Sequence, residues 1–152
     1  MSEYLQTTVD KFTFRVATDR LYTPHGVWVL SMPPQGSSRV RIGVTDFLQQ
    51  HSGDVAFVNV KPTGTQLKAG EEFADMETMK ITLGLPSPIT GTLVEINPSL
   101  ELTPEVVNQD PYGEGWLAVI EGMDWESDRA KLLEAPAYFA VVQSQAEQEL
   151  KS

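Results

Sequence analysis

The sequence predicts a mainly β fold with short helices, and three features predict it. Short apolar segments rich in β-branched and aromatic residues recur along the chain, and ten prolines and eleven glycines punctuate them. Helix signals are fewer and cover short stretches. The turn glycines Gly64 and Gly70 fall between strand candidates, as a flattened barrel of two sheets requires.

The strand candidates are runs of β-branched and aromatic residues bounded by turn-forming residues. The eight expected strands are Thr13–Val16, Val27–Ser31, Arg39–Val44, Asp54–Asn59, Glu72–Met79, Ile81–Leu85, Gly91–Ile96 and Trp116–Ile120. The proline-containing segment Met32–Ser38 between two of them reads as a surface loop.

Two short helices are expected between strands. Thr45 or Asp46 starts the first, which runs to the glycine at Gly53. The second has Thr103 as its N-cap, proline at its first helical position and Asn108 as its stop.

The composition changes after Gly122, where C-terminal helices are expected. Ser127 is the expected N-cap of a helix through Leu133. Another helix follows Pro136 and places Tyr138 and Val142 on one face, at an i, i+4 interval. The polar tail from Gln143 onward is expected to fray.

Size and charge exclude several classes of function. A chain of 152 residues with 41% hydrophobic content predicts a single domain, residues 1–152. The net charge of -10 disfavours nucleic acid and anionic membranes as partners. The absence of cysteine excludes disulfides, zinc-thiolate sites and thiol catalysis by the chain itself. The N-terminal residues show no targeting pattern, so we expect a cytoplasmic protein.

Lys80 is the residue with the clearest chemical prospect. It stands between two strand candidates, in the segment Asp75–Thr82, so we expect it in an exposed hairpin turn, the geometry of a carrier lysine. Elsewhere the sequence shows no nucleophile motif, metal cluster or phosphate loop. An acidic stretch precedes Lys80 and consists of Glu71, Glu72, Asp75 and Glu77. It fits either a solvated face or a surface for a basic partner.

Several segments around this lysine resemble the H-protein of the glycine cleavage system. The matching segments are Gly43–Asp46, Gly53–Val58, Gly70–Phe73, Glu77–Lys80, Pro86–Gly91, Glu95–Asn97 and Val107–Leu117. The last of these is the most specific. The resemblance covers about Leu21 to Ile120, with a looser helical match beyond.

The resemblance implies a barrel-sandwich hybrid fold of the lipoyl and biotinyl carrier type. Its core would span about residues 21–120, with a C-terminal helical extension over about 124–150. Lys80 would carry lipoate in amide linkage, and the chain would be a non-catalytic carrier. The dithiolane of lipoate supplies the redox group that a cysteine-free chain lacks.

The resemblance also implies roles for neighbouring residues and for partner enzymes. Glu77, Met79 and Ile81 would be read by the lipoate ligase or lipoyl transferase that modifies Lys80, and His25 would line the cleft in which the arm rests. The partners in glycine cleavage would be glycine decarboxylase, aminomethyltransferase and dihydrolipoyl dehydrogenase.

Departures from the family pattern keep other functions open. The family has histidine, glutamate and tryptophan in succession, whereas this chain has His25-Gly26-Val27-Trp28. Met79 and Ile81 replace the usual valine and alanine beside the lysine. These changes leave open an H-like lipoate-binding protein that serves a heterodisulfide-reductase-like complex in sulfur oxidation. Methionine before the lysine also fits a biotin carrier, and an unmodified interaction module is the fourth reading.

Overall fold

The computed structural model describes residues 3–34 and 38–151, and within them the strands form three antiparallel sheets. The six-stranded sheet has the order β3 (Leu21–Tyr22), β4 (Val27–Ser31), β5 (Arg39–Val44), β11 (Ala118–Gly122), β10 (Gly91–Ile96) and β7 (Gln66–Leu67). The three-stranded sheet has the order β6 (Val55–Val60), β8 (Glu72–Thr78) and β9 (Thr82–Pro86). β1 (Tyr4–Val9) and β2 (Phe12–Ala17) form a separate hairpin.

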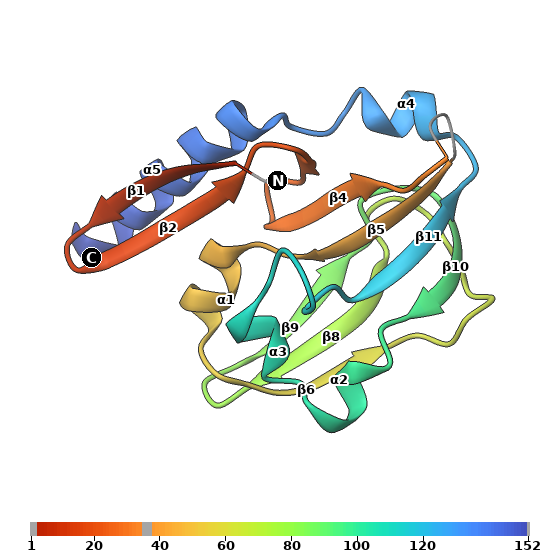
Figure 1. Ribbon diagram of the computed structural model, residues 1–152, viewed down its shortest axis with the longest axis horizontal. Coiled ribbons are helices and arrows are strands. Elements are labelled where there is room, and N and C mark those ends of the chain that lie inside the picture. The colour runs from red at the N-terminus through yellow and green to blue at the C-terminus, as the bar shows by residue number, and fades with distance from the viewer. Residues whose placement is uncertain (1–2, 35–37, 152) are drawn as a thin grey trace.

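The six-stranded and three-stranded sheets face each other across the main hydrophobic core (Figure 1). Alternate residues of β5, from Val40 to Val44, point into this core, and Phe73, Met76 and Leu85 meet them from the opposite sheet. This arrangement confirms the predicted mainly β barrel-sandwich fold.

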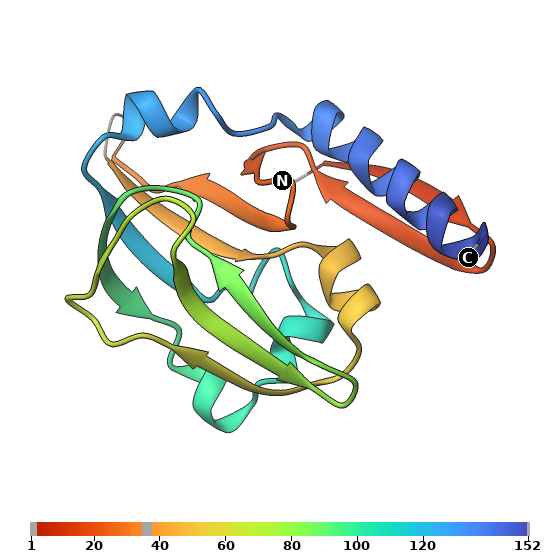
Figure 2. The ribbon, with the colours of Figure 1, turned by 180° about the vertical axis from the view of Figure 1, so that it is seen from behind.

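A second hydrophobic cluster covers the other face of the six-stranded sheet. It joins Trp28 of β4 to Phe14 and Val16 of β2 and to Tyr138 and Val142 of α5 (Ala135–Lys151). Figure 2 shows α5 running beside the β1–β2 hairpin, away from the body of the sandwich. The extent of the domain core, about residues 21–120, stays a prediction. Phe14, Val16, Tyr138 and Val142 of this second cluster lie outside that range.

Most predicted strands are confirmed to within two residues. Those predicted at 27–31, 39–44 and 91–96 have the observed bounds. The sequence prediction missed β1, β3 and β7. Both β3 and β7 have only two residues. They are strands because β3 pairs with β4 and β7 pairs with β10. The hairpin β1–β2 turns at Asp10, whose φ of 58° lies in a region that aspartate tolerates.

The helix predictions had mixed outcomes. α1 (Asp46–Ser52) has the predicted cap, since the Thr45 hydroxyl accepts a hydrogen bond from the Leu48 N–H at 3.2 Å, and Gly53 ends the helix. The prediction at Thr103 was wrong. Its hydroxyl instead donates to the Ser99 carbonyl at 2.9 Å, so it ends the short α2 (Ser99–Leu102). The next helix, α3 (Val106–Gln109), begins two residues after the predicted start at Pro104.

The helix predicted from Ser127 was also wrong. α4 spans Trp125–Arg129, and Leu133 forms a β-bridge with Tyr22 instead of continuing it. The Asp128 carboxylate accepts the Thr90 N–H at 2.8 Å, which fixes α4 against β10. Tyr138 and Val142 share the buried face of α5 as predicted. The tail does not fray at Gln143, because α5 packs along β1 and buries Ala146. The predicted loop Met32–Ser38 lies partly outside the described residues.

Candidate functional site

Lys80 lies in the turn that joins β8 to β9, and both it and Met79 are exposed. The two strands pair up to Glu77 and Thr82, and the Thr78 N–H donates to the Ile81 carbonyl at 2.8 Å. The structure therefore confirms the predicted exposed hairpin turn.

The turn is held by one side chain. The Thr78 hydroxyl oxygen accepts from the N–H groups of Lys80 at 3.2 Å and Ile81 at 3.0 Å, and it donates to the Ile81 carbonyl at 3.1 Å. A threonine that bonds to the backbone two and three residues ahead stabilises a turn without glycine. Lys80 is thus displayed on an ordered turn.

A second segment supports this turn from below. The Met79 N–H donates to the Asp54 carbonyl at 3.0 Å, so the turn is tied to the segment that links α1 to β6. The aliphatic part of Lys80 crosses Gly53, where an added Cβ would lie 3.4 Å from Cε. Gly53 has a φ of +92°, which suits glycine and strains other residues.

Asn108 holds this supporting segment, although the sequence identified it only as a helix stop. Its side-chain oxygen accepts the Val55 N–H at 2.8 Å, and its amide donates to the Gly53 carbonyl at 3.1 Å. The signal available beforehand was its place in the most specific segment of the family resemblance, Val107–Leu117.

The three residues expected to be read by a modifying enzyme surround Lys80. Met79 is 78% exposed and Ile81 is 42% exposed, unusually high for apolar side chains. Glu77 is half-buried near the end of β8, with the Asn59 amide 3.5 Å from its carboxylate. Their positions fit a recognition surface, and the recognition itself stays a prediction.

His25 lies apart from the lysine turn. It is exposed and lines a cleft of about 580 Å³ between the β3–β4 turn, α1 and α5. The lining of this cleft, among the described residues, includes no residue of the lysine turn. The structure therefore does not bring His25 and Lys80 together there, and its role beside the arm stays a prediction.

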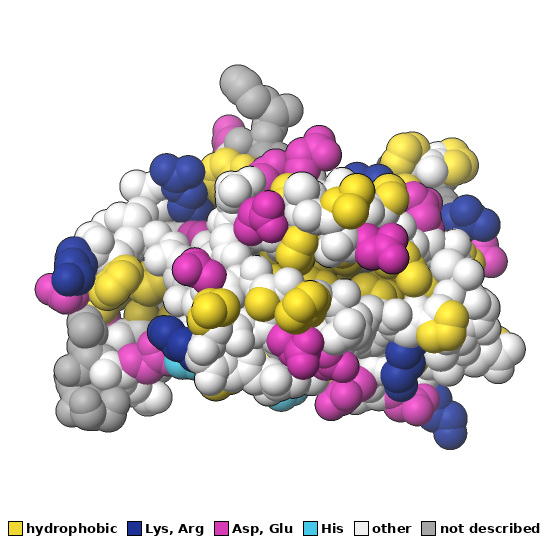
Figure 3. All heavy atoms as spheres, turned by 90° about the horizontal axis from the view of Figure 1, so that it is seen from below, with side chains coloured by type: hydrophobic (Ala, Val, Ile, Leu, Met, Phe, Trp, Pro, Cys, Tyr) yellow, Lys and Arg dark blue, Asp and Glu magenta, His cyan; other side chains and the backbone are white. Residues whose placement is uncertain are grey.

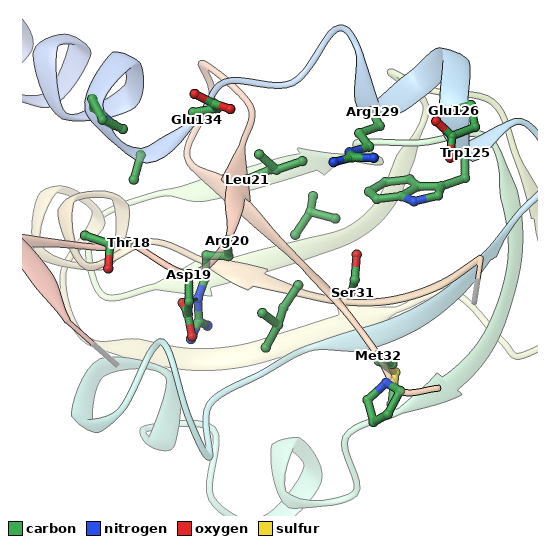
Figure 4. A pocket seen from close by; sticks show the side chains of 15 residues that line it. Thr18, Asp19, Arg20, Leu21, Ser31, Met32, Trp125, Glu126, Arg129 and Glu134 are labelled. Atoms are coloured by element: carbon green, nitrogen blue, oxygen red, sulfur yellow. Dashed lines mark hydrogen bonds and ion pairs between the residues drawn. The ribbon is translucent and has the colours of Figure 1, made fainter. Parts of the chain in front are cut away.

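A separate cleft has a volume of about 880 Å³ (Figure 4). Trp125 and Arg129 of α4 stand on one side, and Arg20 lies on the other beside Asp19. Arg20 is already engaged, since it donates to the Asp19 carboxylate at 2.8 Å and to the Tyr112 carbonyl at 2.9 Å. No described residue of β8, β9 or their turn lines this cleft, so it is not part of the lysine site.

The acidic stretch before Lys80 divides into two groups. Glu71 accepts the Lys68 N–H at 2.8 Å, and the Glu72 carboxylate packs over Gly84, so both serve the local fold. Asp75 and Glu77 share the Asn59 amide on the outer face of the three-stranded sheet. Figure 3 shows acidic side chains around a hollow with hydrophobic side chains at its base, on the face that carries β6 and α2.

In residues 3–34 and 38–151, no three His, Cys, Asp or Glu side chains are grouped so as to hold a metal ion. Over the same ranges, none of the helices combines the length and the apolar character needed to span a membrane.

Comparison with known proteins gives a consistent match. The family model described as "Glycine cleavage H-protein" matches residues 20–145. A glycine cleavage system H protein of Chlorobium limicola is 43% identical over 123 residues, which cover 81% of this chain and 94% of that protein. One from Thermus thermophilus is 40% identical over 131 residues, 86% of this chain and 98% of that protein.

A solved structure shows the same arrangement. The crystal structure of a glycine cleavage system H protein from Mycobacterium marinum matches with a TM-score of 0.70 and 30% sequence identity, over 80% of this chain and 94% of that one. Sequence, family model and structure agree. The chain therefore belongs to the glycine cleavage H-protein family.

Proposed function

We propose that this protein is a lipoyl carrier of the glycine cleavage system, with lipoate attached through an amide bond to Lys80. The observation that carries the proposal is the exposed Lys80 turn between β8 and β9, in a chain that belongs to this family. A carrier displays one lysine to several enzymes, and this turn displays one.

The residues present fit an acylated lysine. Lys80 is exposed and takes part in none of the ion pairs of the described residues, so its amine is accessible to a modifying enzyme. The Thr78 bonds keep the turn in one conformation, which spares the enzyme the cost of ordering it. When attached, lipoate supplies a disulfide that can be reduced to two thiols.

The chain's own part is presentation and docking, without catalysis. Lipoate ligase or lipoyl transferase would read Glu77, Met79 and Ile81 around the lysine. Glycine decarboxylase, aminomethyltransferase and dihydrolipoyl dehydrogenase would then bind the carrier in succession. A tether of this kind gives a local concentration on the order of millimolar at a docked active site. The acidic side chains of Figure 3 would steer partners with basic surfaces.

A second candidate is a lipoate-binding protein of a heterodisulfide-reductase-like sulfur oxidation system. The exposed Met79 and Ile81 favour it, because they change the surface that a partner meets beside the lysine. The His25-Gly26-Val27 segment departs from the family pattern as well. A biotin carrier is the third candidate and rests on the Met79-Lys80-Ile81 triplet alone.

Intact mass measurement after native expression tests the proposal. A lipoyl increment, mapped to Lys80 by peptide analysis, supports both lipoyl readings. A biotinyl increment would support the third candidate, and an unmodified native protein would exclude all carriers. Reconstitution with glycine decarboxylase then separates the lipoyl readings, since failure of the lipoylated protein to accept an aminomethyl group would reject glycine cleavage.

A further inference from the structure

A continuous series of hydrogen bonds connects the N-terminal hairpin to the lysine turn. It begins at β2, where the Arg15 N–H donates to Asp46 Oδ2 at 2.9 Å. The Gln49 amide donates to the other oxygen of Asp46 at 2.8 Å. The Asn108 amide donates in turn to Gln49 Oε1 at 2.9 Å. The series thus crosses α1 and reaches Asn108.

From Asn108 the series continues to the lysine turn. Its side chain binds both sides of Asp54, through the carbonyl of Gly53 and the N–H of Val55. Asp54 is the residue whose carbonyl accepts the Met79 N–H. Asn108 therefore fixes a segment that contacts both the backbone of the turn and the aliphatic part of Lys80.

Asparagine suits this position for a chemical reason. An amide side chain provides one acceptor and two donors in one plane, and all three are used here, toward Val55, Gly53 and Gln49. Gln49 is 8% exposed, so its buried side-chain oxygen would lose its hydrogen-bond donor if Asn108 were replaced by alanine. Aspartate would keep only the acceptor, and alanine none of the three groups.

We propose that Asn108 is a positioning residue for the lysine turn. Its side chain links the position of Lys80 to α1 and to the β1–β2 hairpin. The hairpin lies outside residues 20–145, the part of the chain that the family model matches. The inference rests on the proposed function only for the consequence of the positioning, which is efficient lipoylation of Lys80.

Asn97 provides a matched control. It also makes three side-chain hydrogen bonds, to the carbonyls of Glu114 and Trp116 and from the Ser99 N–H, and it is 4% exposed. None of these partners belongs to the lysine turn or to its support. Asn97→Ala should therefore destabilise the protein without altering the turn specifically.

The test compares Asn108→Ala, Asn108→Asp and Asn97→Ala in the full chain. Amide hydrogen exchange is measured at Met79 and Val55, together with thermal unfolding and the kcat/KM of a lipoate ligase acting on each variant with lipoate. We expect Asn108→Ala to accelerate exchange at both amides by roughly tenfold, because local hydrogen bonds are lost. The kcat/KM for lipoylation should fall several-fold, since fewer molecules present the turn correctly.

Asn108→Asp should keep the Val55 amide protected, because its carboxylate still accepts that N–H, and should accelerate exchange at Met79 less than alanine does. Unchanged exchange at Met79 in Asn108→Ala would overturn the proposal, and so would an equal acceleration in Asn97→Ala. The exchange readout needs no lipoate. Absence of lipoate from the native protein would therefore reject the proposed function and leave the positioning intact.

Discussion

The lysine turn and the aromatic layer beneath α5 are built in opposite ways. The turn, residues 78–81, is mostly exposed and is held by the bonds of Thr78 to its immediate neighbours. The aromatic layer, Tyr22, Trp28 and Tyr138, is at most 1% exposed. Two of its polar side-chain groups bind partners distant in the sequence: Trp28 Nε1 donates to the Pro111 carbonyl at 2.9 Å, and the Tyr138 hydroxyl bonds to that of Thr45 at 2.8 Å.

The difference shows where stability and chemistry reside in this protein. Burial of large rings supplies free energy of folding, and the stacked rings of Tyr22 and Tyr138, 4.6 Å apart, fix α5 on the sheet. The turn contributes little buried area, so it is free to carry residues suited to recognition. Substitutions in the layer should change stability, and substitutions in the turn should change modification.

Replacement of the lysine should have the largest effect. Lys80→Arg removes the only amine in the turn and should abolish the lipoyl mass increment. A guanidinium stays protonated at physiological pH and is not acylated. The thermal midpoint should stay unchanged, since the side chain is exposed. Lys68→Arg, on another exposed lysine, is the control, and a lipoyl increment that persists in Lys80→Arg would contradict the assignment.

Crowding the aromatic layer should have the next largest effect. A Cβ at Gly43 would lie 2.5 Å from Trp28 Cζ2, so we expect Gly43→Ala to cost about 1–3 kcal/mol in the free energy of unfolding. Denaturant titration measures it. The cost should shrink in a Trp28→Phe background, where those ring atoms are gone, and an equal cost in both backgrounds would refute this packing. Lipoylation of the folded protein should be unaffected.

Tyr138 should give a smaller, pH-dependent effect. Burial raises the pKa of its hydroxyl to about 12, from an ordinary 10.0. Between pH 10 and about pH 12 the unfolded chain loses this proton and the folded protein keeps it. The free energy of unfolding should therefore fall by about 1.4 kcal/mol for each unit by which the pH rises. Burial raises the pKa of Tyr22 and Tyr112 in the same direction.

The variant Tyr138→Phe isolates this contribution. At neutral pH it should cost about 1 kcal/mol, because the Thr45 hydroxyl loses a hydrogen bond of 2.8 Å. The alkaline slope should become shallower in the same variant. Tyr4→Phe, at an exposed tyrosine, should not change the free energy of unfolding at neutral pH. An alkaline slope identical to that of the unsubstituted protein would show that Tyr138 titrates normally.

Glu77 should give the smallest effect. Glu77→Gln removes one half-exposed charge beside the lysine turn, and we expect the KM of the lipoate ligase to rise by roughly two- to threefold without a change in stability. Steady-state kinetics at two salt concentrations measure it, since a charge effect weakens with salt. Glu95→Gln, at the exposed position of β10, is the control. Equal KM changes in both variants would indicate a general charge effect.

Local signals in the sequence predicted much of the fold. The alternation of β-branched residues fixed strands such as Arg39–Val44, and Thr45 with Gly53 marked both ends of α1. The predicted Ser127 helix does not continue to Leu133, because Leu133 pairs with Tyr22, which lies 111 residues earlier in the chain. The sequence did not predict β3 for a related reason. Its two residues form a strand only because β4 lies beside them.

Local patterns, each read within a few residues, were enough to predict the carrier-type fold, the exposed lysine turn and the family resemblance. The support of the turn became visible only in three dimensions. Asp54 lies 25 residues before Met79, and Asn108 lies 29 residues after it, yet hydrogen bonds place both beneath Lys80. Such contacts follow from the packing of α1, α3 and the three-stranded sheet, and no local pattern encodes them.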